Sequence, residues 1–295
     1  MNKMKECKVI VPIGCRSDEG LSKPIIRRLN TSSMFKCYPV NLVPANFIES
    51  YNIMSHMITT SEPDLIFLTG DRIEMYASAC AGFHANVKMA HYGAGILNYP
   101  IITFDDIDRH CITLKSNIHL CTCREEARTV QKLFNSLKIG MKANIHTVGI
   151  THLDDLEISE ELVPEEPYDL ILLNPETINN TITKNTIQNL LPNNLENVIT
   201  IGPNPDGDVP ILFGIDSSSK YYPNLPRAQF LGLLKNCKRF ITNSSSAYYE
   251  APFFLKKEQI ILVGMRNLNR SKGQFKRNGS DRILKVLQDW WEKQN

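Results

Sequence analysis

Short runs of Ile, Val and Leu recur along the chain and predict β-strands, while the segments between them carry apolar residues every three or four positions and predict helices. The expected strands are residues 8–14, 64–70, 87–93, 117–123, 144–150, 168–174, 197–202, 239–243 and 259–264. The clearest helices are expected at residues 72–86, 124–137, 227–236 and 281–293. Strands that alternate with helices are typical of a parallel sheet covered on both faces. The chain is therefore predicted to have an α/β fold.

One stretch interrupts this alternation about halfway along the chain. Residues 151–167, THLDDLEISEELVPEEP, are acidic and contain two prolines. Because domain boundaries fall in polar, proline-containing linkers, we expect a first domain at residues 1–158 and a second at residues 159–295. The Asn-rich segment at residues 176–197 is interpreted as a helix with ragged ends.

Composition and charge narrow the class of protein. The chain has 295 residues, 42% of them hydrophobic, and its 33 Lys and Arg nearly balance 31 Asp and Glu. Because it has no polybasic arm or acidic tail, neither a nucleic acid nor a membrane is expected as a partner. No apolar run approaches the roughly 18 residues needed to cross a bilayer, and the N-terminus passes directly into the first expected strand. A soluble, cytoplasmic protein is expected.

The cysteines do not form a recognisable metal-binding pattern. Cys121 and Cys123 are the one close pair among eight, and alternation along a strand would point both side chains to one face. We expect reduced core thiols there, with a metal site as the minor alternative. No metal is predicted.

Two predicted strands end in polar turns that are suited to a ligand. After the first, Gly14 and the following helix start would aim free amides and the Arg16 guanidinium at a phosphate. After the second, Asp71 and Arg72 lie at the carboxyl edge of the same sheet, where Asp71 could serve as a general base or bind a sugar hydroxyl. The alternatives are a plain strand-to-helix turn and an Asp71 that caps the next helix.

A third polar cluster lies at residues 104–110, FDDIDRH. The adjacent carboxylates of Asp105 and Asp106 repel each other, so one can have a raised pKa and transfer protons near neutrality, beside Arg109 and His110. An ordinary acidic helix start is the alternative, and carboxylates alone do not select Mg²⁺.

The second half offers a hydroxyl-rich turn. Ser244, Ser245 and Ser246 follow a predicted strand and open a helix that carries Glu250. Hydroxyls and amides there can bind a diphosphate, and the carboxylate can accept hydrogen bonds from ribose hydroxyls. A serine-capped helix without a ligand remains the alternative. A Ser-His-Asp triad is not supported, because no histidine follows residue 152.

In order and spacing, these segments resemble the UDP-N-acetylglucosamine 2-epimerase family, and more closely its hydrolysing branch, which supplies N-acetylmannosamine or related sugars for sialic-acid-type biosynthesis. The similar stretches are IGCRSDEGLSKPI, PDLIFLTGDRIEM, FDDIDRHCITLKSNIHL, IGPNPDGD, LPRAQFLGLLKN, FITNSSSAYYEAP and VGMRNLNRSKG. The resemblance implies a GT-B architecture, with two Rossmann-like domains facing a cleft that holds a nucleotide sugar. It also implies a last helix that packs back on the first domain.

Carried over position by position, the resemblance implies a site made by both domains. In the first, sugar-side domain, the catalytic residues would be Asp71, Asp105, Asp106, Arg109 and His110. In the second, nucleotide-binding domain, Ser244 and Ser245 would hold the diphosphate and Glu250 the ribose. The full set of implied substrate-binding residues is Arg16, Ser17, Asp18, Arg72, His91, Asn174, Asp206, Leu225, Ser244, Ser245, Ser246, Glu250, Arg266 and Arg270.

The implied reaction eliminates UDP across C1 and C2 to give a glycal, and water then adds to release a free N-acetylmannosamine-type sugar. No cofactor is implied, the partner is a UDP-linked sugar, and a homodimer is compatible with the resemblance. The chain departs from the family at Asn174, where a histidine is expected before proline, and around Gly93, where no acid follows His91. A non-hydrolysing epimerase, a degenerate nucleotide-sugar-binding protein and a GT-B glycosyltransferase are the alternatives.

Overall fold

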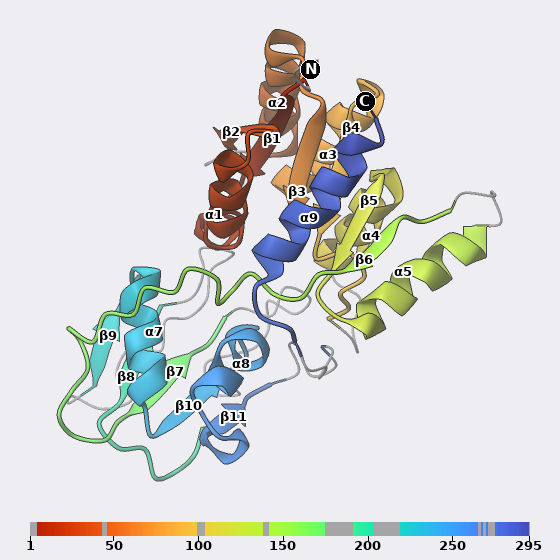
Figure 1. Cartoon of the computed structure of the whole chain (residues 1–295). Helices are drawn as coiled ribbons and strands as arrows, with labels where there is room; N and C mark the ends of the chain where they lie inside the picture. The colour runs from red at the N-terminus through yellow and green to blue at the C-terminus, as the bar shows by residue number, and fades with distance from the viewer. Residues whose placement is uncertain are drawn as a thin grey trace. The chain divides into compact units, whose positions relative to one another are not determined.

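The computed structural model describes residues 5–42, 46–98, 104–137, 142–174, 191–202, 219–264, 267, 270 and 275–294. The chain divides into two compact units (Figure 1). Unit 1 comprises Met1–Leu97, Phe104–Asp154 and Gly273–Asn295, and unit 2 comprises Asn98–Thr103 and Asp155–Lys272. The last helix thus belongs to the same unit as the N-terminal half of the chain.

Unit 1 is built on a six-stranded sheet with the order β2-β1-β3-β4-β5-β6. All of its strand pairs are parallel. The strands are β1 (Cys7–Ile13), β2 (Phe35–Asn41), β3 (Leu65–Thr69), β4 (Lys88–Tyr92), β5 (Ile118–Cys121) and β6 (Ile145–Thr147). The helices are α1 (Arg16–Thr31), α2 (Phe47–Ser61), α3 (Ile73–His84), α4 (Phe104–Lys115), α5 (Arg124–Leu137) and α9 (Gly279–Glu292).

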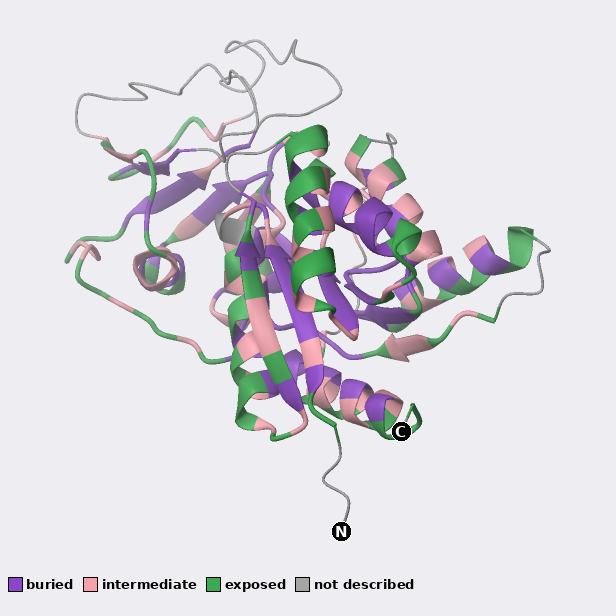
Figure 2. Ribbon diagram, turned by 90° about the horizontal axis from the view of Figure 1, so that it is seen from above, coloured by how far each residue is buried: buried purple, intermediate pink, exposed green. Residues whose placement is uncertain are grey.

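Alternating side chains give this sheet two apolar faces, so helices cover both. Val9 and Val11 of β1 point into the cluster that contains the buried residues of α1 and α9. Ile10 points to the opposite face, where α2, α3 and α4 supply the packing side chains. Figure 2 shows the buried residues concentrated along the central strands and the inner helix faces.

Unit 2 repeats this architecture with a five-stranded parallel sheet in the order β11-β10-β7-β8-β9. Its strands are β7 (Asp169–Leu172), β8 (Ile199–Ile201), β9 (Lys220–Tyr222), β10 (Arg239–Thr242) and β11 (Ile260–Leu262). Its helices are α7 (Arg227–Asn236), α8 (Ser246–Tyr249) and two short 3₁₀ segments, η1 (Ala251–Phe253) and η2 (Lys257–Gln259). Leu231, Leu233 and Leu234 of α7 pack into the larger of its two core clusters.

The predicted α/β fold with two Rossmann-like domains is confirmed, and every predicted strand overlaps an observed one. Two observed strands were missed, β2 and β9. Both lie at an edge of their sheet. Edge strands tolerate proline and alternate less clearly, and β2 contains Pro39 and an exposed Lys36 within its seven residues. The Asn-rich helix predicted at residues 176–197 falls largely outside the described residues.

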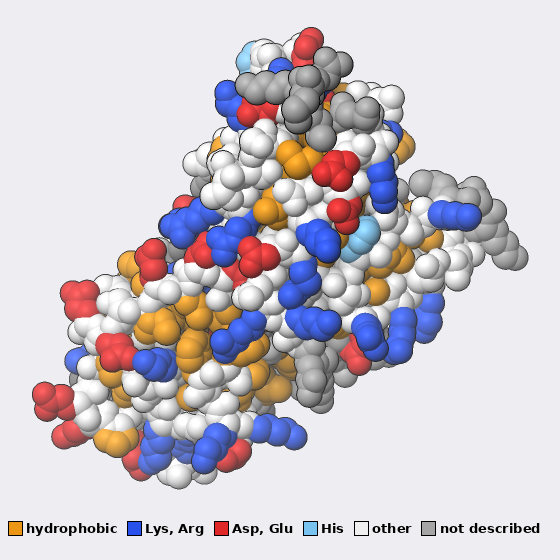
Figure 3. Space-filling view, viewed as in Figure 1, with side chains coloured by type: hydrophobic (Ala, Val, Ile, Leu, Met, Phe, Trp, Pro, Cys, Tyr) orange, Lys and Arg blue, Asp and Glu red, His pale blue; other side chains and the backbone are white. Residues whose placement is uncertain are grey.

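The described surface of unit 1 mixes both signs of charge. In the view of Figure 3, Lys and Arg side chains lie beside Asp and Glu over α1 and α9, where Arg28 Nε is 2.6 Å from Asp281 Oδ1. Among the described residues, no helix has both the length and the apolar character needed to span a membrane.

Candidate functional site

The strand order of unit 1 locates the edge where a ligand is expected. In doubly wound parallel sheets, ligands bind outside the carboxyl ends of the strands, at the point where the winding reverses. In unit 1 this point lies between β1 and β3, because β2 lies beyond β1 and β4 lies beyond β3. The turns after β1 and β3 are the two polar turns that the sequence singled out.

The turn after β1 is closed by one of its own side chains. Asp18 Oδ2 accepts hydrogen bonds from the backbone N–H groups of Gly14 and Cys15, both at 3.1 Å. The Asp18 side chain is almost fully buried, and burial raises its pKa to about 6 against the opposing attraction of Arg72. The prediction that these two amides are free for a phosphate is therefore wrong. The Asp18 carboxylate thus caps the turn through Oδ2.

The turn after β3 presents the predicted acid. Gly70 has φ +82°, a left-handed conformation that glycine adopts without strain. The next residue, Asp71, forms an ion pair with Arg109 of α4, and the Asp71 side chain is 20% exposed against 3% for Arg109. The N-cap position of α3 belongs to Arg72, so Asp71 binds a guanidinium rather than capping that helix. Arg72 Nε lies 3.4 Å from Glu74 Oε2.

Helix α4 places its polar residues on different faces. Asp106, Arg109 and Thr113 recur at three- and four-residue spacing and are buried. Asp105 and Asp108 are half-buried. Burial raises the pKa of the Asp108 carboxyl, and the nearby charge of Asp105 adds to the effect. The sequence led us to expect a raised pKa at Asp105 or Asp106, whereas the carboxyl whose pKa is raised is that of Asp108, which was not predicted.

His110, on the same helix, is half-buried. Its Nδ1 atom is buried and has no hydrogen-bond partner in the described part of the chain. Burial and the neighbouring Arg109 charge lower the pKa of His110, while Asp106 acts in the opposite direction. A neutral imidazole with an unbonded nitrogen can accept a proton, which is compatible with the proton-transfer role predicted for His110.

His91 does not lie where a substrate-binding residue would lie. Its side chain on β4 is 0% exposed. Its Nε2 atom is 2.8 Å from the Gly70 carbonyl oxygen, and its Nδ1 atom is 3.1 Å from Thr113 Oγ1. Because both ring nitrogens are bonded and no surface is exposed, the prediction that His91 contacts the substrate is not supported by its place in the structure.

Gly93 follows β4 beside the Asp71–Arg109 pair. Arg109 Nη1 donates to the Gly93 carbonyl oxygen at 3.4 Å. A Cβ atom at position 93 would lie 3.9 Å from Arg109 Nη1 and 3.9 Å from Gly70 Cα. The resemblance leads us to expect an acidic residue around position 93. This position faces the Asp71–Arg109 ion pair, but its glycine has no side chain.

In unit 2 the winding reverses between β7 and β10, which places Asn174 and Asn243 at the equivalent edge. The Asn174 N–H donates to Asn243 Oδ1, and Asn243 Nδ2 donates to the Asn174 carbonyl oxygen, both at 2.7 Å. Asn267 Nδ2 donates in turn to the Asn243 carbonyl oxygen at 2.7 Å. These bonds use the main chain of Asn174 and are independent of its side chain. Asn243 was not predicted, although it directly precedes the serine run.

The serine turn after β10 is partly self-bonded. The Ser244 N–H donates to Thr242 Oγ1 at 2.9 Å, and Ser244 Oγ lies 3.3 Å from Ser246 Oγ. Further along, Glu250 is 4% exposed and its Oε1 atom accepts from Arg227 Nη2 at 3.1 Å. Glu250 is thus already paired with the guanidinium of Arg227, at the start of α7. The sequence did not indicate this partner.

The remaining predicted binding residues lie at several places. Leu225 is buried in the larger core cluster of unit 2. Arg270 Nε donates to Asn98 Oδ1 at 2.9 Å, and its guanidinium lies 5.5 Å from the centroid of the Tyr249 ring. Outside the described residues are the side chains of Arg16 and Ser17 and the whole of Asp206 and Arg266.

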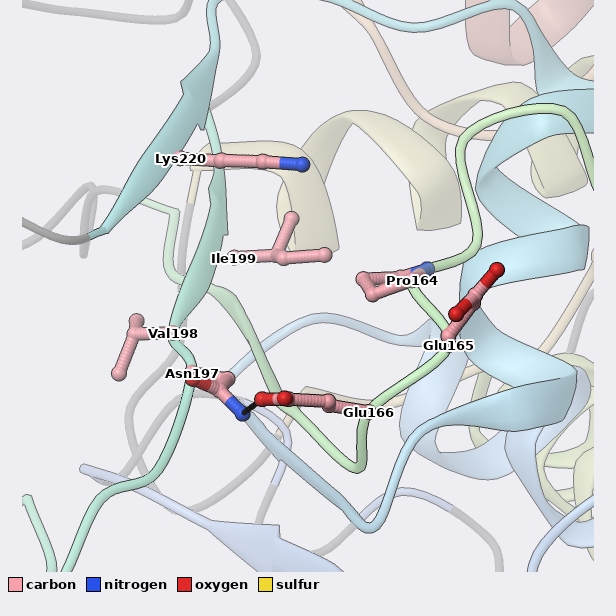
Figure 4. A pocket seen from close by; sticks show the side chains of 7 residues that line it. All are labelled: Pro164, Glu165, Glu166, Asn197, Val198, Ile199 and Lys220. Atoms are coloured by element: carbon pink, nitrogen blue, oxygen red, sulfur yellow. Dashed lines mark hydrogen bonds between the residues drawn. The ribbon is translucent and has the colours of Figure 1, made fainter.

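A pocket in unit 2 lies away from this edge. It is lined by Pro164, Glu165, Glu166, Asn197, Val198, Ile199 and Lys220 (Figure 4). Asn197 and Val198 immediately precede β8, so the pocket lies near the amino end of that strand rather than at the carboxyl edge. Asn197 Nδ2 donates to Glu166 Oε2 at 3.2 Å across it. It is not part of the candidate site.

Cys121 and Cys123 are both buried, and neither is part of a disulfide. Burial raises the pKa of the Cys121 thiol, which disfavours the thiolate that a metal would bind. Within the described ranges, no group of three or more His, Cys, Asp or Glu side chains is placed to hold a metal ion.

Acid is expected to destabilise unit 1 through two buried histidines. His91 and His119 are register partners on β4 and β5, and burial lowers their pKa values from 6.5 to about 4 and about 3. The unfolded chain binds protons in this range that the folded rings do not. The contribution of these two rings to the free energy of unfolding is therefore fully present above pH 6.5 and is lost as the pH falls. The loss is about 3 kcal/mol per ring near pH 4. The raised pKa of Asp18 acts in the opposite direction.

Urea unfolding of wild type and His119→Leu between pH 7 and pH 4 measures this effect. The variant should lose less stability on acidification than wild type, because one buried ring has been removed. His56→Leu is the matched control, since His56 is exposed. An identical pH dependence in wild type and His119→Leu would contradict the expected contribution.

Together, two doubly wound parallel sheets define an α/β protein of GT-B type, and each sheet carries polar turns at its reversal point, where a ligand is expected. The family model described as UDP-N-acetylglucosamine 2-epimerase matches residues 49–294. The chain belongs to the UDP-N-acetylglucosamine 2-epimerase family.

Individual relatives agree with this assignment. The chain is 31% identical over 270 residues to a UDP-N-acetylglucosamine 2-epimerase of Neisseria meningitidis serogroup B. The aligned region covers 82% of this chain and 66% of that relative. It is 28% identical over 243 residues to a hydrolysing GDP/UDP-N,N'-diacetylbacillosamine 2-epimerase of Campylobacter jejuni. This aligned region covers 76% of this chain and 62% of that relative. The chain thus spans less than two thirds of the length of these curated relatives.

A solved structure, the co-structure of S. aureus MnaA with UDP, has the same fold. The TM-score is 0.74, and the match covers 97% of each chain at 14% sequence identity.

Proposed function

We propose that the protein is a nucleotide-sugar 2-epimerase of the hydrolysing type, acting on UDP-N-acetylglucosamine or a close relative and releasing UDP and an N-acetylmannosamine-type sugar. The observation that carries this proposal is the Asp71–Arg109 ion pair at the reversal point of unit 1, in a chain of the 2-epimerase family. Asp71 is the more exposed partner of the pair, so its carboxylate is the group available to a substrate.

The first chemical step needs a base for the C2 proton. In this proposal Asp71 takes that proton, the C1–O bond to UDP breaks, and C1 and C2 become doubly bonded in the glycal. The Arg109 guanidinium pairs with the Asp71 carboxylate, so a cation lies beside the group that takes the proton. In the second step, water adds its oxygen to C1 and a proton returns to C2. The attacking water gives up a proton in this step, and the His110 imidazole, which its lowered pKa keeps neutral, is suited to accept it.

The leaving diphosphate needs hydrogen-bond donors that strengthen as its charge develops. We assign this role to Ser244 and Ser245, which follow β10 at the reversal point of unit 2. Glu250 would accept from the ribose while its other contact, Arg227, neutralises its charge. The assignment of the nucleotide to unit 2 is supported by these hydroxyls.

The hydrolysing outcome is favoured over a non-hydrolysing one by similarity to the Campylobacter relative, whose name specifies hydrolysis. A second candidate function is nucleotide-sugar binding without turnover. Asn174 favours it, because an amide cannot exchange protons near neutral pH as a histidine can, and so does Gly93, which has no side chain beside the ion pair.

Anion-exchange chromatography of protein incubated with UDP-N-acetylglucosamine distinguishes these functions. Stoichiometric UDP and free N-acetylmannosamine are expected from the hydrolysing enzyme. UDP-N-acetylmannosamine would show the non-hydrolysing reaction. An unchanged substrate pool, with UDP binding detected by calorimetry, would overturn the enzyme assignment in favour of the binding protein. The same assay with a UDP-linked diacetamido sugar tests whether a close relative of UDP-N-acetylglucosamine is the substrate.

A further inference from the structure

The buried ring of His91 connects two elements that carry the candidate catalytic pair. The Gly70 carbonyl oxygen can only accept a hydrogen bond, so His91 Nε2, at 2.8 Å, carries the hydrogen and donates it. On its other side, His91 Nδ1 lies 3.1 Å from Thr113 Oγ1 of α4. The ring therefore joins the end of β3 to α4 from its place on β4.

The bond to Gly70 acts directly on the position of Asp71. The Gly70 carbonyl belongs to the peptide group whose nitrogen is that of Asp71, so fixing this oxygen fixes the plane from which Asp71 extends. The Gly70 N–H donates to the Tyr92 carbonyl oxygen at 3.0 Å. Both main-chain polar groups of Gly70 are thus bonded to β4, and a glycine with positive φ would otherwise have wide freedom.

The bond to Thr113 acts on the partner of Asp71. Thr113 lies one turn after Arg109 on α4, and its Oγ1 atom donates to the Arg109 carbonyl oxygen at 2.8 Å. Arg109 pairs with Asp71. The contacts therefore form a closed series. It runs from His91 through Gly70, Asp71, Arg109 and Thr113 and back to His91.

The protonation state suits a positioning role. Because burial holds the pKa of His91 at about 4, the ring is neutral near pH 7. Its Nδ1 atom is then an acceptor, and the Thr113 hydroxyl, which has one hydrogen, donates it either to this nitrogen or to the Arg109 carbonyl oxygen. A neutral ring adds no charge that would compete with Arg109 for the Asp71 carboxylate.

We propose that His91 is a positioning residue, which sets the Asp71 carboxylate against the Arg109 guanidinium by holding the Gly70 peptide and Thr113 at the same time. This inference rests on the proposed function for its catalytic meaning, since Asp71 is the base there. The arrangement of the pair is a property of unit 1 that can be measured without turnover.

The test compares His91→Gln, whose amide can still donate to the Gly70 oxygen, with His91→Leu, which cannot. For His91→Leu, kcat should fall roughly 10-fold to 100-fold while KM stays within about twofold, because a misplaced base slows chemistry more than binding. His91→Gln should recover most of kcat. Thr113→Val, which removes only the α4 contact, should show a smaller fall and serves if His91→Leu does not fold.

A second readout does not require activity. In protein labelled with ¹³C at the aspartate carboxyl carbon, the Asp71 signal is identified by its loss in Asp71→Asn. Its titration midpoint should rise by about half a pH unit or more in His91→Leu, because the guanidinium is no longer aligned with it. His91→Gln should keep the wild-type midpoint. His119→Gln is the matched control, being the same substitution at the register partner on β5, and should change neither kcat nor the midpoint.

The two proposals fail in distinguishable ways. If wild type turns over no nucleotide sugar, the proposed function fails, and the carboxyl midpoint alone decides whether His91 positions Asp71. If His91→Leu, or Thr113→Val in its place, keeps the wild-type midpoint and rate, the positioning role is overturned whatever the reaction is.

Discussion

Replacing Asp71 by asparagine is expected to lower kcat for UDP release roughly 1000-fold while leaving the Kd for UDP within about twofold. Loss of a positioned general base typically costs about 100-fold to 10,000-fold. An amide matches the shape of the carboxylate but cannot take the C2 proton. UDP is assigned to unit 2, so its affinity should be unaffected. Steady-state kinetics and calorimetry measure the two quantities.

The structure also indicates how this variant should fold. The amide in Asp71→Asn would keep an oxygen for the Arg109 guanidinium, which is only 3% exposed and would otherwise lose this contact. Asp289→Asn is the matched control, because Asp289 is exposed on α9 and its replacement should retain full activity. If Asp71→Asn keeps kcat within about fivefold of wild type, the base lies elsewhere, and Asp105 and His110 become the next candidates.

The second large effect is expected on nucleotide binding. The double variant Ser244→Ala with Ser245→Ala should weaken UDP binding roughly 100-fold or more, because each hydrogen bond to a charged group contributes about 1.5–3 kcal/mol. Calorimetric titration with UDP measures the change. Thermal unfolding should shift little, since the hydrogen bonds that join the Ser244 hydroxyl to Ser246 are long, at 3.3 Å.

A serine far from this turn provides the control for the double variant. Ser136→Ala removes a hydroxyl of α5 in unit 1 that donates to the Leu133 carbonyl oxygen, so UDP affinity should not change. UDP affinity that is equal in wild type and in the double variant would remove the serine turn from the site. The nucleotide would then have to be held by other residues.

The sequence indicated the polar turns at the two reversal points because each turn directly follows a short apolar run. Asp71 and Ser244 both stand just after such strands, and parallel strands bring their carboxyl ends to a common edge. Helices α5 and α7 were predicted with their observed bounds, since their apolar spacing is regular. The edge strands β2 and β9 were missed because they lack that regular apolar pattern.

The contacts inside the site could not be predicted in the same way. An Asp four residues after a glycine can cap its own turn or face a ligand, and only the fold shows that Asp18 bonds to Gly14. The contact of His91 Nδ1 is with Thr113, 22 residues away in sequence. The pairing of Glu250 with Arg227 likewise depends on the arrangement of α7 in unit 2. Spacing along a chain does not encode such contacts.

The most direct measurement of the central claim is proton NMR of the protein incubated with UDP-N-acetylglucosamine in D₂O. Abstraction of the C2 proton by Asp71 and its return from solvent predict free N-acetylmannosamine that carries deuterium at C2, with UDP released in equal amount. A released sugar that retains its C2 proton, or a substrate spectrum that stays unchanged, would contradict the account.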